Sequence, residues 1–496
     1  MTVFQILDSF AQDLVIENET DTTREVTFDN DYTYDSDEEY KTYHKKKNAS
    51  EQGLSYGSKS RVMVIHIFAT NSDGHHLRIN LEGFEPYFYV KVPENSKSIF
   101  ETILKMSCEG IKVKIEYVKR KVLFGYTGGR DYNFAKLSVS SKKDFANLKN
   151  AFLSKENQPI FSLTHSSKPL EVFEANLDPM LRFFHLRNIQ TCGWATILDN
   201  PELNDSGILE LNARWDDIKP YKSPPVAVAP FLIASWDIEC YSENGEFPLA
   251  VKNYERVVNL IHHNAKSAED ARYLLSNAIL YPENPPNGMD ALRGRSGVPM
   301  KQEHLEFLFK KAEFNQLLDE ALELREKDKS ESILAIAKCL KPLEKLFPLA
   351  GDPVIQIGVV LQRGQLPPQK HIFVLGACDA VPQVEVYSYK TEREMILGWA
   401  KMMKEWNVDI LMGYNTFGFD ERYLWLRAEE LRIHQTENIQ ALTRLNDAEK
   451  QVTLDEKFLS SSALGDNTMY IWSTHGRLQI DLYHYVKRSY LSLIHI

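Results

Sequence analysis

Cysteine is scarce in this sequence, and its spacing excludes two common kinds of small stabilised domain. The 496 residues include 5 cysteines, and no two of them form a Cys-x-x-Cys pair. Dense cysteine frameworks are typical of small secreted domains, and closely spaced cysteines are typical of structural zinc sites. We therefore expect a reduced, intracellular protein without structural zinc in this stretch. The cysteines are Cys108, Cys192, Cys240, Cys339 and Cys378.

Long apolar runs are absent as well. No segment approaches the roughly 20 consecutive apolar residues that a membrane-spanning helix needs, and no charged stretch followed by an apolar one opens the chain. The sequence therefore predicts a soluble protein that is not secreted and has no membrane partner.

The chain also lacks an excess of positive charge. It has 58 lysine and arginine residues against 69 aspartate and glutamate residues, which gives a formal charge of -11. This balance argues against nonspecific coating of nucleic acid, although a local basic groove remains compatible with it. Part of the acid lies in one polar run, which we expect to form a solvated, disordered insertion at about residues 29–58.

The chain is long enough for several domains, and its pattern changes near Pro230. With 496 residues, 43% of them hydrophobic, we expect two to four domains. Residues 60–140 alternate apolar and polar positions between turn signals, which predicts a mostly β region with helices at 98–106 and 142–153. After Pro230 the pattern predicts strands at 231–239, 353–362, 370–376, 408–412 and 478–482, and helices at 391–406 and 420–433.

The order of strands and helices in the second region predicts a ribonuclease-H-like mixed sheet, so the expected fold class is α/β. Residues 252–348 interrupt this order and are expected to form a helical insertion, whose role the sequence does not reveal. The adjacent His262 and His263 lack the i, i+4 spacing of a helical metal site, so we interpret them as surface or packing residues. The expected helices of the insertion span 254–263, 268–280 and 304–326.

Two carboxylates occupy the end of the first strand of the second region. Asp237 and Glu239 are two positions apart, so both project from the same face of a strand, about 6.5 Å from each other along it. Two hard divalent ions about 3.5 to 4 Å apart need several carboxylate oxygens, and Asp420 from a distant segment would add a third acid. Any one such acid is more often a solvated strand edge or a helix cap.

The identity and order of these acids resemble the 3′→5′ proofreading exonuclease of family B DNA polymerases. Asp237-Ile238-Glu239 is similar to its first motif, and Tyr414-Asn415 followed by Phe419-Asp420 is similar to its second. Further strings resemble the family's N-terminal domain and its delta-like branch, which includes polymerases of large DNA viruses. The N-terminal strings are Gly83-Phe-Glu-Pro-Tyr-Phe-Tyr-Val90, Phe124-Gly-Tyr126, Glu174-Ala-Asn176, Leu181-Arg-Phe-Phe184 and Gly193-Trp194; the delta-like strings are Asp237-Ile-Glu-Cys-Tyr241 and Gly351-Asp-Pro-Val-Ile-Gln-Ile-Gly358.

The resemblance implies a domain organisation, partners and a location. It implies a template-cradling N-terminal domain over 1–229 and a 3′→5′ exonuclease domain over 230–490, interrupted by the insertion at 252–348. The parent protein would be a DNA-directed DNA polymerase of DNA replication. Its partners would be a single-stranded 3′ end, primer-template DNA, and a sliding clamp or accessory subunits bound through a further portion. It would act in the nucleus or at a viral replication site.

The resemblance also implies roles for the candidate site residues. Asp237 would bridge two Mg²⁺ or Mn²⁺ ions, Glu239 would join it on one ion, and Asp420 would hold the second ion through water. Asn415, Phe419 and Tyr414 would bind the frayed single-stranded end, because flexible strands are held mainly through stacking and backbone contacts.

Alternatives remain at the level of the residue and of the whole chain. Phe419 is equally well explained as a core residue under the helix that follows it. The chain could also be a noncatalytic DNA-binding or scaffold module of the same fold, although all three acids are present. A free-standing exonuclease is a third reading, which the N-terminal resemblance disfavours. Metal-dependent release of mononucleotides from a 3′ end would distinguish an enzyme from a DNA-binding module.

Several strings that the family carries are missing. The sequence contains neither Ser-Leu-Tyr-Pro-Ser nor Asp-Thr-Asp-Ser, which carry the polymerase metal acids, and no Tyr-x-x-x-Asp follows Asp481. The resemblance therefore implies a fragment without the polymerase motifs and the third exonuclease motif. Residues 491–496 match a translation of a transposon-end sequencing adaptor, so we expect a non-native tail there.

Overall fold

The structure is a computed structural model that describes most of the chain and divides it into two units. Unit 1 comprises Met1–Phe231, Arg444–Gln451 and His475–Leu478, and unit 2 comprises the remainder. The acidic run at 29–58 and the tail at 491–496, for which we made predictions, lie outside the described residues. The described residues are 1–16, 27–28, 60–123, 125–164, 167–203, 208–310, 312–445, 451–461 and 465–489.

Unit 1 contains a long sheet built around two extended strands. Strands β1 (Thr2–Ile16) and β3 (Ser60–Thr70) pair antiparallel along most of their length, as expected for their alternation of apolar and polar residues. Helix α3 (Pro179–Arg187) begins at the cap Asp178 and buries Phe183 and Phe184 against the sheet. The described strands run in the order β10 (Glu202–Leu203), β11 (Leu209–Arg214), β4 (His76–Glu82), β3, β1, β9 (Trp194–Ile197) and β12 (Lys219–Pro220), with β2 (Thr27–Phe28) paired to β1.

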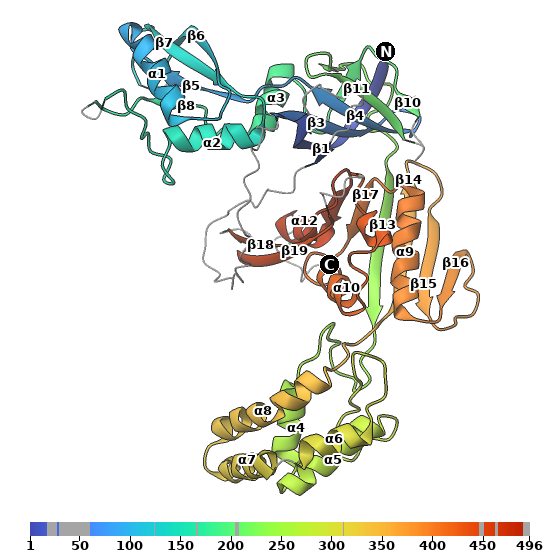
Figure 1. Ribbon diagram of the computed structural model, residues 1–496. Coiled ribbons are helices and arrows are strands. Elements are labelled where there is room, and N and C mark those ends of the chain that lie inside the picture. The colour runs from blue at the N-terminus through green and yellow to red at the C-terminus, as the bar shows by residue number, and fades with distance from the viewer. Residues whose placement is uncertain are drawn as a thin grey trace. The chain divides into compact units, whose positions relative to one another are not determined.

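A second sheet in unit 1 has two helices packed on one face. Its elements follow the chain as β5 (Tyr87–Lys91), α1 (Lys97–Ser107), β6 (Lys114–Lys121), β7 (Asp131–Ser138), α2 (Lys142–Phe152) and β8 (Val172–Phe173), and its strand order is β6-β7-β5-β8. We call this arrangement the βαββαβ module (Figure 1). The helices expected at 98–106 and 142–153 are confirmed. The helix face of the sheet is buried by Phe88, Val90, Phe100, Leu104, Ala135, Leu137, Phe145, Leu148 and Phe152.

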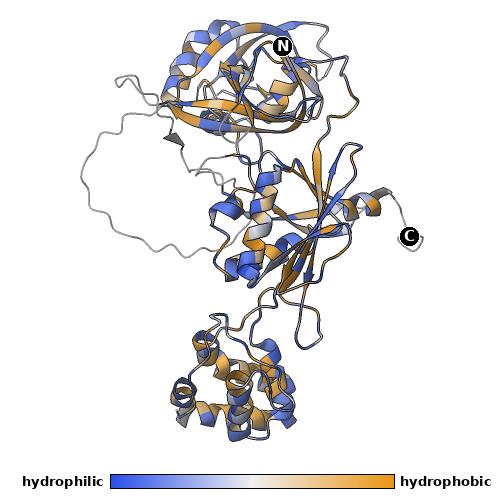
Figure 2. Ribbon diagram, turned by 90° about the vertical axis from the view of Figure 1, so that its right-hand side faces the viewer, coloured by the Kyte–Doolittle hydropathy of each residue, from blue (hydrophilic) through white to orange (hydrophobic). Residues whose placement is uncertain are grey.

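Unit 2 contains the mixed sheet that the sequence predicted, which confirms the α/β fold class. Strand β13 (Leu232–Cys240) runs antiparallel to β14 (Val354–Arg363) and parallel to β17 (Ile410–Gly413). Helix α9 (Glu392–Trp406) begins with the expected capping box of Thr391 and Glu394. Hydrophobic residues, orange in Figure 2, run along the strands of this sheet. The order is β16 (Val384–Tyr389), β15 (Gln369–Leu375), β14, β13, β17 and β20 (Leu478–Asp481), and the helices include α10 (Asp420–Glu430), α11 (Glu437–Gln440) and α12 (Leu482–Ser489).

The sequence prediction missed two β features of unit 2, and it also named no helix at α8 (Lys329–Leu346), α11 or α12. We expected three strands before α9, but β16 adds a fourth, parallel to β15. The hairpin of β18 (Leu454–Ser461) and β19 (Gly465–Trp472) was not predicted either. Both β16 and the hairpin keep many side chains partly or fully exposed, so their sequences carry a weak signal of burial.

The insertion at 252–348 is helical and has a hydrophobic core of its own. The single helix expected at 304–326 is wrong, because α6 (Gln302–Phe309) and α7 (Ala312–Glu323) are separate. Phe309 and Phe314 are both buried with rings 5.3 Å apart, yet five residues of continuous helix would turn them well away from one face. The other elements are α4 (Glu255–Asn264), α5 (Ala268–Leu280), the 3₁₀ turn η2 (Leu324–Glu326) and α8 (Lys329–Leu346).

Buried polar residues in the insertion are hydrogen-bonded within it. The ring of His262 lies 3.1 Å from the Ser332 hydroxyl, and that hydroxyl donates to the Ala321 carbonyl. Since the hydroxyl hydrogen is used by the carbonyl, Nδ1 of His262 must be the donor to Ser332. His262 is therefore a packing residue and His263 an exposed one, as the sequence analysis expected.

Candidate active site

Strand β13 presents its acids and its apolar side chains on opposite faces. Trp236 and Ile238 are buried, whereas Asp237 and Glu239 are exposed, so the period of two predicted from the sequence is confirmed. Trp236 packs with its ring centroid 5.6 Å from that of Trp472. The core thus anchors one face of β13 and leaves the acids on the other.

Asp420 reaches the same strand from the first turn of α10. Its side chain is 3% exposed, and one carboxylate oxygen accepts a hydrogen bond from the Ile238 backbone N–H at 3.2 Å. The negative charge of the nearby Asp237 also acts on this carboxyl. Residues 237 and 420, far apart in sequence, are therefore brought together.

The environment favours a protonated Asp420 when no cation is bound. Burial, followed by the negative charge of Asp237, raises the pKa of Asp420 to about 7. Two neighbouring carboxylates repel each other when both are ionised. The pair therefore either shares a proton or binds a cation between its oxygens. Carboxylate oxygens are the donors preferred by Mg²⁺ and Mn²⁺.

The third predicted acid is on the correct face but is not joined to this pair. Glu239 is exposed two positions beyond Asp237 and lies opposite Gln356 of β14. Within the described residues, no group of three or more histidine, cysteine, aspartate or glutamate side chains is arranged to hold a metal ion. The contact in the structure is thus the pair of Asp237 and Asp420, and a ligand role for Glu239 stays a prediction.

The loop between β17 and α10 is held by an acid that the sequence analysis did not select. The Asp481 side chain accepts from the backbone N–H of Asn415 at 2.7 Å, of Phe417 at 3.1 Å and of Tyr483 at 2.8 Å. Asn415 has φ of +63°, a left-handed conformation that asparagine tolerates better than most residues. Asp481 thereby fixes the loop that carries Asn415 into α10. Its only sequence signal is a lone acid in an expected strand.

Phe419 contacts both the core and the surface. Its ring centroid is 5.2 Å from that of Tyr423 in α10 and 5.5 Å from that of Phe247. Phe247 is 72% exposed and lies in the loop after β13. The sequence analysis did not select Phe247 as a candidate site residue, because it is a single aromatic residue among polar ones. Tyr414 is exposed, with its ring edge-to-face against Tyr483. The exposed rings of Tyr414 and Phe247 thus lie at the two ends of the loop that precedes α10.

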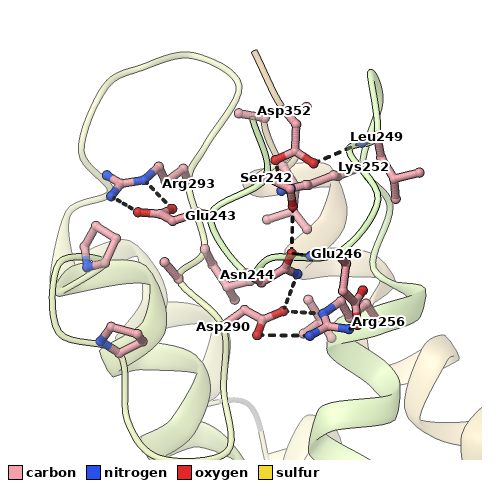
Figure 3. A pocket seen from close by; sticks show the side chains of 18 of the residues that line it. Ser242, Glu243, Asn244, Glu246, Leu249, Lys252, Arg256, Asp290, Arg293 and Asp352 are labelled. Atoms are coloured by element: carbon pink, nitrogen blue, oxygen red, sulfur yellow. Dashed lines mark hydrogen bonds and ion pairs between the residues drawn. The ribbon is translucent and has the colours of Figure 1, made fainter. Parts of the chain in front are cut away.

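A cavity of about 540 Å³ lies beyond the end of β13, where the insertion leaves and rejoins the sheet (Figure 3). Its cations are paired with carboxylates, so it lacks the unpaired positive charge that a phosphate would need. These contacts hold the two ends of the insertion together and form no part of the acid site. The pairs are Arg293 with Glu243 and Glu283, Arg256 with Asp290 and Glu246, and Lys252 with Asp352.

The mixed sheet of unit 2 thus carries acids at its surface, and unit 1 is rich in strands. The chain belongs to DNA polymerase family B, because the family model described as "DNA polymerase family B, exonuclease domain" matches residues 170–280 and 322–494. The unmatched stretch between these ranges falls inside the insertion. Within the described residues, no helix is long and apolar enough to cross a membrane.

Similar proteins include viral and cellular DNA polymerases. The DNA polymerase of Pyramimonas orientalis virus is 27% identical over 86% of this chain and 39% of that protein. The DNA polymerase delta catalytic subunit of Candida albicans is 22% identical over 85% of this chain and 31% of that protein. The chain thus spans well under half of either relative. A solved family B DNA polymerase of Pyrobaculum calidifontis is 16% identical, with a TM-score of 0.43 over 86% of this chain and 35% of that one.

Proposed function

We propose that this chain is the N-terminal and proofreading portion of a replicative DNA polymerase, and that its acid site removes nucleotides from 3′ ends. In this proposal an N-terminal domain spans 1–229, an exonuclease domain spans 230–490, and 252–348 is an insertion in the latter. The observation that carries the proposal is the hydrogen bond from the Ile238 backbone N–H to Asp420, which brings Asp420 of α10 to the segment of β13 between Asp237 and Glu239.

The residues of the site supply oxygen ligands for metal ions and contacts for the DNA strand. Asp237, Asp420 and Glu239 would hold two Mg²⁺ or Mn²⁺ ions, which supply a more acidic water and stabilise the leaving 3′ oxygen when bound. The Ile238 N–H keeps Asp420 oriented toward β13. Phe247 and Phe419 offer ring edges against which a frayed base can pack. Asn415 and Tyr414, both exposed, would contact the sugar-phosphate backbone.

A nuclease assay tests this proposal. The substrate is single-stranded DNA labelled at its 5′ end, incubated with the parent polymerase, or with this chain extended by its downstream residues, in Mg²⁺ or in EDTA. We expect shortening from the 3′ end in Mg²⁺ and none in EDTA. Asp237→Ala and Asp420→Ala should each lower the rate by at least about 10- to 100-fold. Asp379→Ala, at an exposed acid beyond β15, is the matched control.

The competing function is DNA binding without cleavage. If the intact parent protein retains DNA but releases no mononucleotides in Mg²⁺ or Mn²⁺, the proposal of an exonuclease fails and the binding module is favoured. DNA synthesis, a sliding clamp and accessory subunits belong to the proposed parent polymerase, whose synthesis is assayed separately by primer extension.

A further inference from the structure

The βαββαβ module of unit 1 has a second face, opposite its helices, on which aromatic and basic residues alternate. Directly paired residues share a face of a sheet, and the pairs Tyr89 with Lys136 and Lys91 with Phe134 lie away from the buried helix face. We call this the open face. Its members are Tyr87, Tyr89, Lys91, Glu116, Val118, Arg120, Tyr132, Phe134, Lys136 and Phe173.

The rings of the open face form a continuous row across three strands. Ring centroids are 5.5 Å apart for Tyr87 and Tyr89, 6.4 Å for Tyr89 and Phe134, and 5.3 Å for Phe134 and Phe173. Phe134 is buried beneath its neighbours, whereas Tyr87, Tyr89 and Phe173 are partly exposed. Partly exposed rings on a sheet offer contact surface to planar ligands.

Cations lie directly over these rings. The ammonium of Lys136 is 4.4 Å from the ring centroid of Tyr87, and that of Lys91 is 4.3 Å from that of Tyr132. Arg182 of α3 lies 4.1 Å from the Tyr87 ring. The mixture of basic groups and rings matches the backbone and the bases of a single strand, which present phosphates and planar rings in alternation.

Carboxylates pair with these cations in the free protein. Glu171 bridges Lys91 at 2.9 Å, Glu116 bridges Lys136 at 3.5 Å, and Glu174 bridges Arg182 at 2.6 Å. The first two glutamates are about 60% exposed, so their pairs are worth little in water and can exchange for a phosphate. Removal of one of these glutamates should therefore strengthen binding of a polyanion.

A cavity of about 300 Å³ opens at one end of the open face. Lys91 and Tyr132 line it together with Asn133, Asp131 and Glu171. Its carboxylates would repel a phosphate, while its amide and carboxylate groups can hydrogen-bond a base edge. The cavity thus suits a base that follows those stacked on the rings.

We propose that the open face binds single-stranded nucleic acid, with bases stacked on Tyr87, Tyr89 and Tyr132 and with phosphates held by Lys91, Lys136 and Arg120. A four-stranded βαββαβ sheet whose uncovered face carries aromatic residues is a general solution for gripping unpaired bases. This site is separate from the proposed exonuclease acids, and it does not depend on their activity.

Substitution of the rings tests the stacking. Binding of the 496-residue chain to fluorescent oligothymidine and oligouridine is followed by anisotropy in EDTA, where cleavage is excluded. Tyr87→Leu and Tyr132→Leu each keep apolar bulk but remove the ring, and each should raise Kd by roughly tenfold. Tyr273→Leu, at a tyrosine 60% exposed on α5, is the matched control and should leave Kd unchanged. Equal Kd values for the open-face variants and the control overturn the proposal.

Substitution of the charges gives effects of opposite sign. Lys136→Ala should weaken binding and lower the slope of log Kd against log salt by about one unit. Glu116→Gln, which frees Lys136, should tighten binding instead. A merely structural role of the pair would not produce a gain of affinity. Lys310→Ala removes a lysine paired with Glu306 on α6 and serves as control.

The final comparison separates this site from the exonuclease. The open-face variants should lose affinity in EDTA both in the wild-type background and in a background that carries Asp237→Ala and Asp420→Ala. If the acid variants abolish strand binding while the open-face variants do not, the strand binds at the exonuclease site and the open face has another role. A duplex of the same sequence should compete poorly, whereas equal competition by the duplex contradicts stacking. Preference for oligouridine over oligothymidine, or the reverse, identifies the strand type within the same proposal.

Discussion

Asp237 is exposed and Asp420 is only 3% exposed, yet the charge of the first acts on the carboxyl of the second. Each residue alone is ordinary, since acids are common at strand ends and in first turns of helices. Together they place two negative groups in contact, one of them desolvated, with a backbone N–H fixing the buried one. At the residue scale, this contact is why a divalent cation is the expected ligand.

Addition of a divalent cation should therefore stabilise the protein. Mg²⁺ or Mn²⁺ bound at this pair would relieve the repulsion between Asp237 and Asp420. A ligand that binds the folded state alone raises its stability by about 2.7 kcal/mol at a concentration of 100 Kd. Thermal unfolding followed by circular dichroism should show a higher Tm in Mg²⁺ than in EDTA. Asp237→Asn should remove most of this difference, whereas Asp379→Asn should preserve it. An unchanged Tm at saturating Mg²⁺ argues against a metal at this pair.

Replacement of Asp481 tests the support of the Asn415 loop. In the native protein the Asp481 carboxylate accepts hydrogen bonds from the N–H groups of Asn415 and Phe417. Asp481→Asn replaces one of its acceptor oxygens with an amide group that donates. We expect a loss of about 1 to 3 kcal/mol in the free energy of unfolding, measured by urea titration. Asp466→Asn, at an exposed acid in the β18–β19 hairpin, should cost less than about 0.5 kcal/mol. Equal costs for the two variants would show that the loop does not need Asp481.

Burial of His371 predicts a loss of stability in acid. Desolvation lowers the pKa of His371, although the charge of Glu385 opposes this. The folded state therefore binds a proton less readily than the unfolded state, so stability is complete above the unfolded pKa of about 6.5 and falls as pH drops through the folded pKa. His371→Gln should reduce the fall in Tm between about pH 7 and pH 5. His263→Gln, at an exposed histidine, should have the wild-type pH dependence.

At the scale of elements, the insertion is joined to the sheet through contacts at its base. The Tyr254 hydroxyl donates to the Phe347 carbonyl at 2.8 Å, and Lys252 bridges Asp352 at 2.5 Å. Since the two ends of the segment are held together, β13 and β14 can pair as if the insertion were a short turn. The hydrophobic core of the helices is separate from that of the sheet.

Deletion of the insertion should thus leave the sheet folded. A short Gly/Ser linker in place of 252–348 is expected to preserve soluble expression and the thermal transition of the remainder, because few core contacts cross the base. Differential scanning calorimetry should show loss of one transition and retention of the others. Loss of folding on deletion would show that the insertion shares the core of unit 2. A same-length deletion that removes α9, which buries Trp399, is expected to abolish folding.

At the scale of the molecule, unit 1 is completed by residues from much later in the chain. The Gly476 N–H donates to Asp8 at 2.8 Å, and the ring of His475 lies 4.2 Å from that of Phe10. Arg444 also belongs to unit 1, and its guanidinium donates to the Gly476 carbonyl. The stability of unit 1 is therefore expected to depend on residues beyond position 440.

Gly476→Ala tests this dependence. Gly476 has φ of +82°, and a Cβ there would lie 2.8 Å from both the Phe68 ring and Arg444. We expect a loss of at least about 1 to 3 kcal/mol from strain and crowding, seen as a lower Tm of unit 1. Gly465→Ala is a matched control, since φ is +72° but no atom lies within 4 Å of the added Cβ. A similar cost at both glycines would assign the whole effect to backbone strain.

Local residue patterns and the motifs that resemble the family predicted much of this protein's secondary structure and its candidate acids. The alternation in β13 fixed which face carries Asp237, and the capping box fixed where α9 begins, because both depend on residues within one or two turns of chain. Only the tertiary structure decided the features that depend on distant segments. It brought Asp420 close to Asp237, and it placed Asp481 where it accepts hydrogen bonds from the Asn415 loop. It also divided the expected 304–326 helix in two. It also assembled the open face, whose rings come from three strands separated by helices. Sequence periodicity reports the burial of each segment, but the partner that covers it is selected only when the segments pack together.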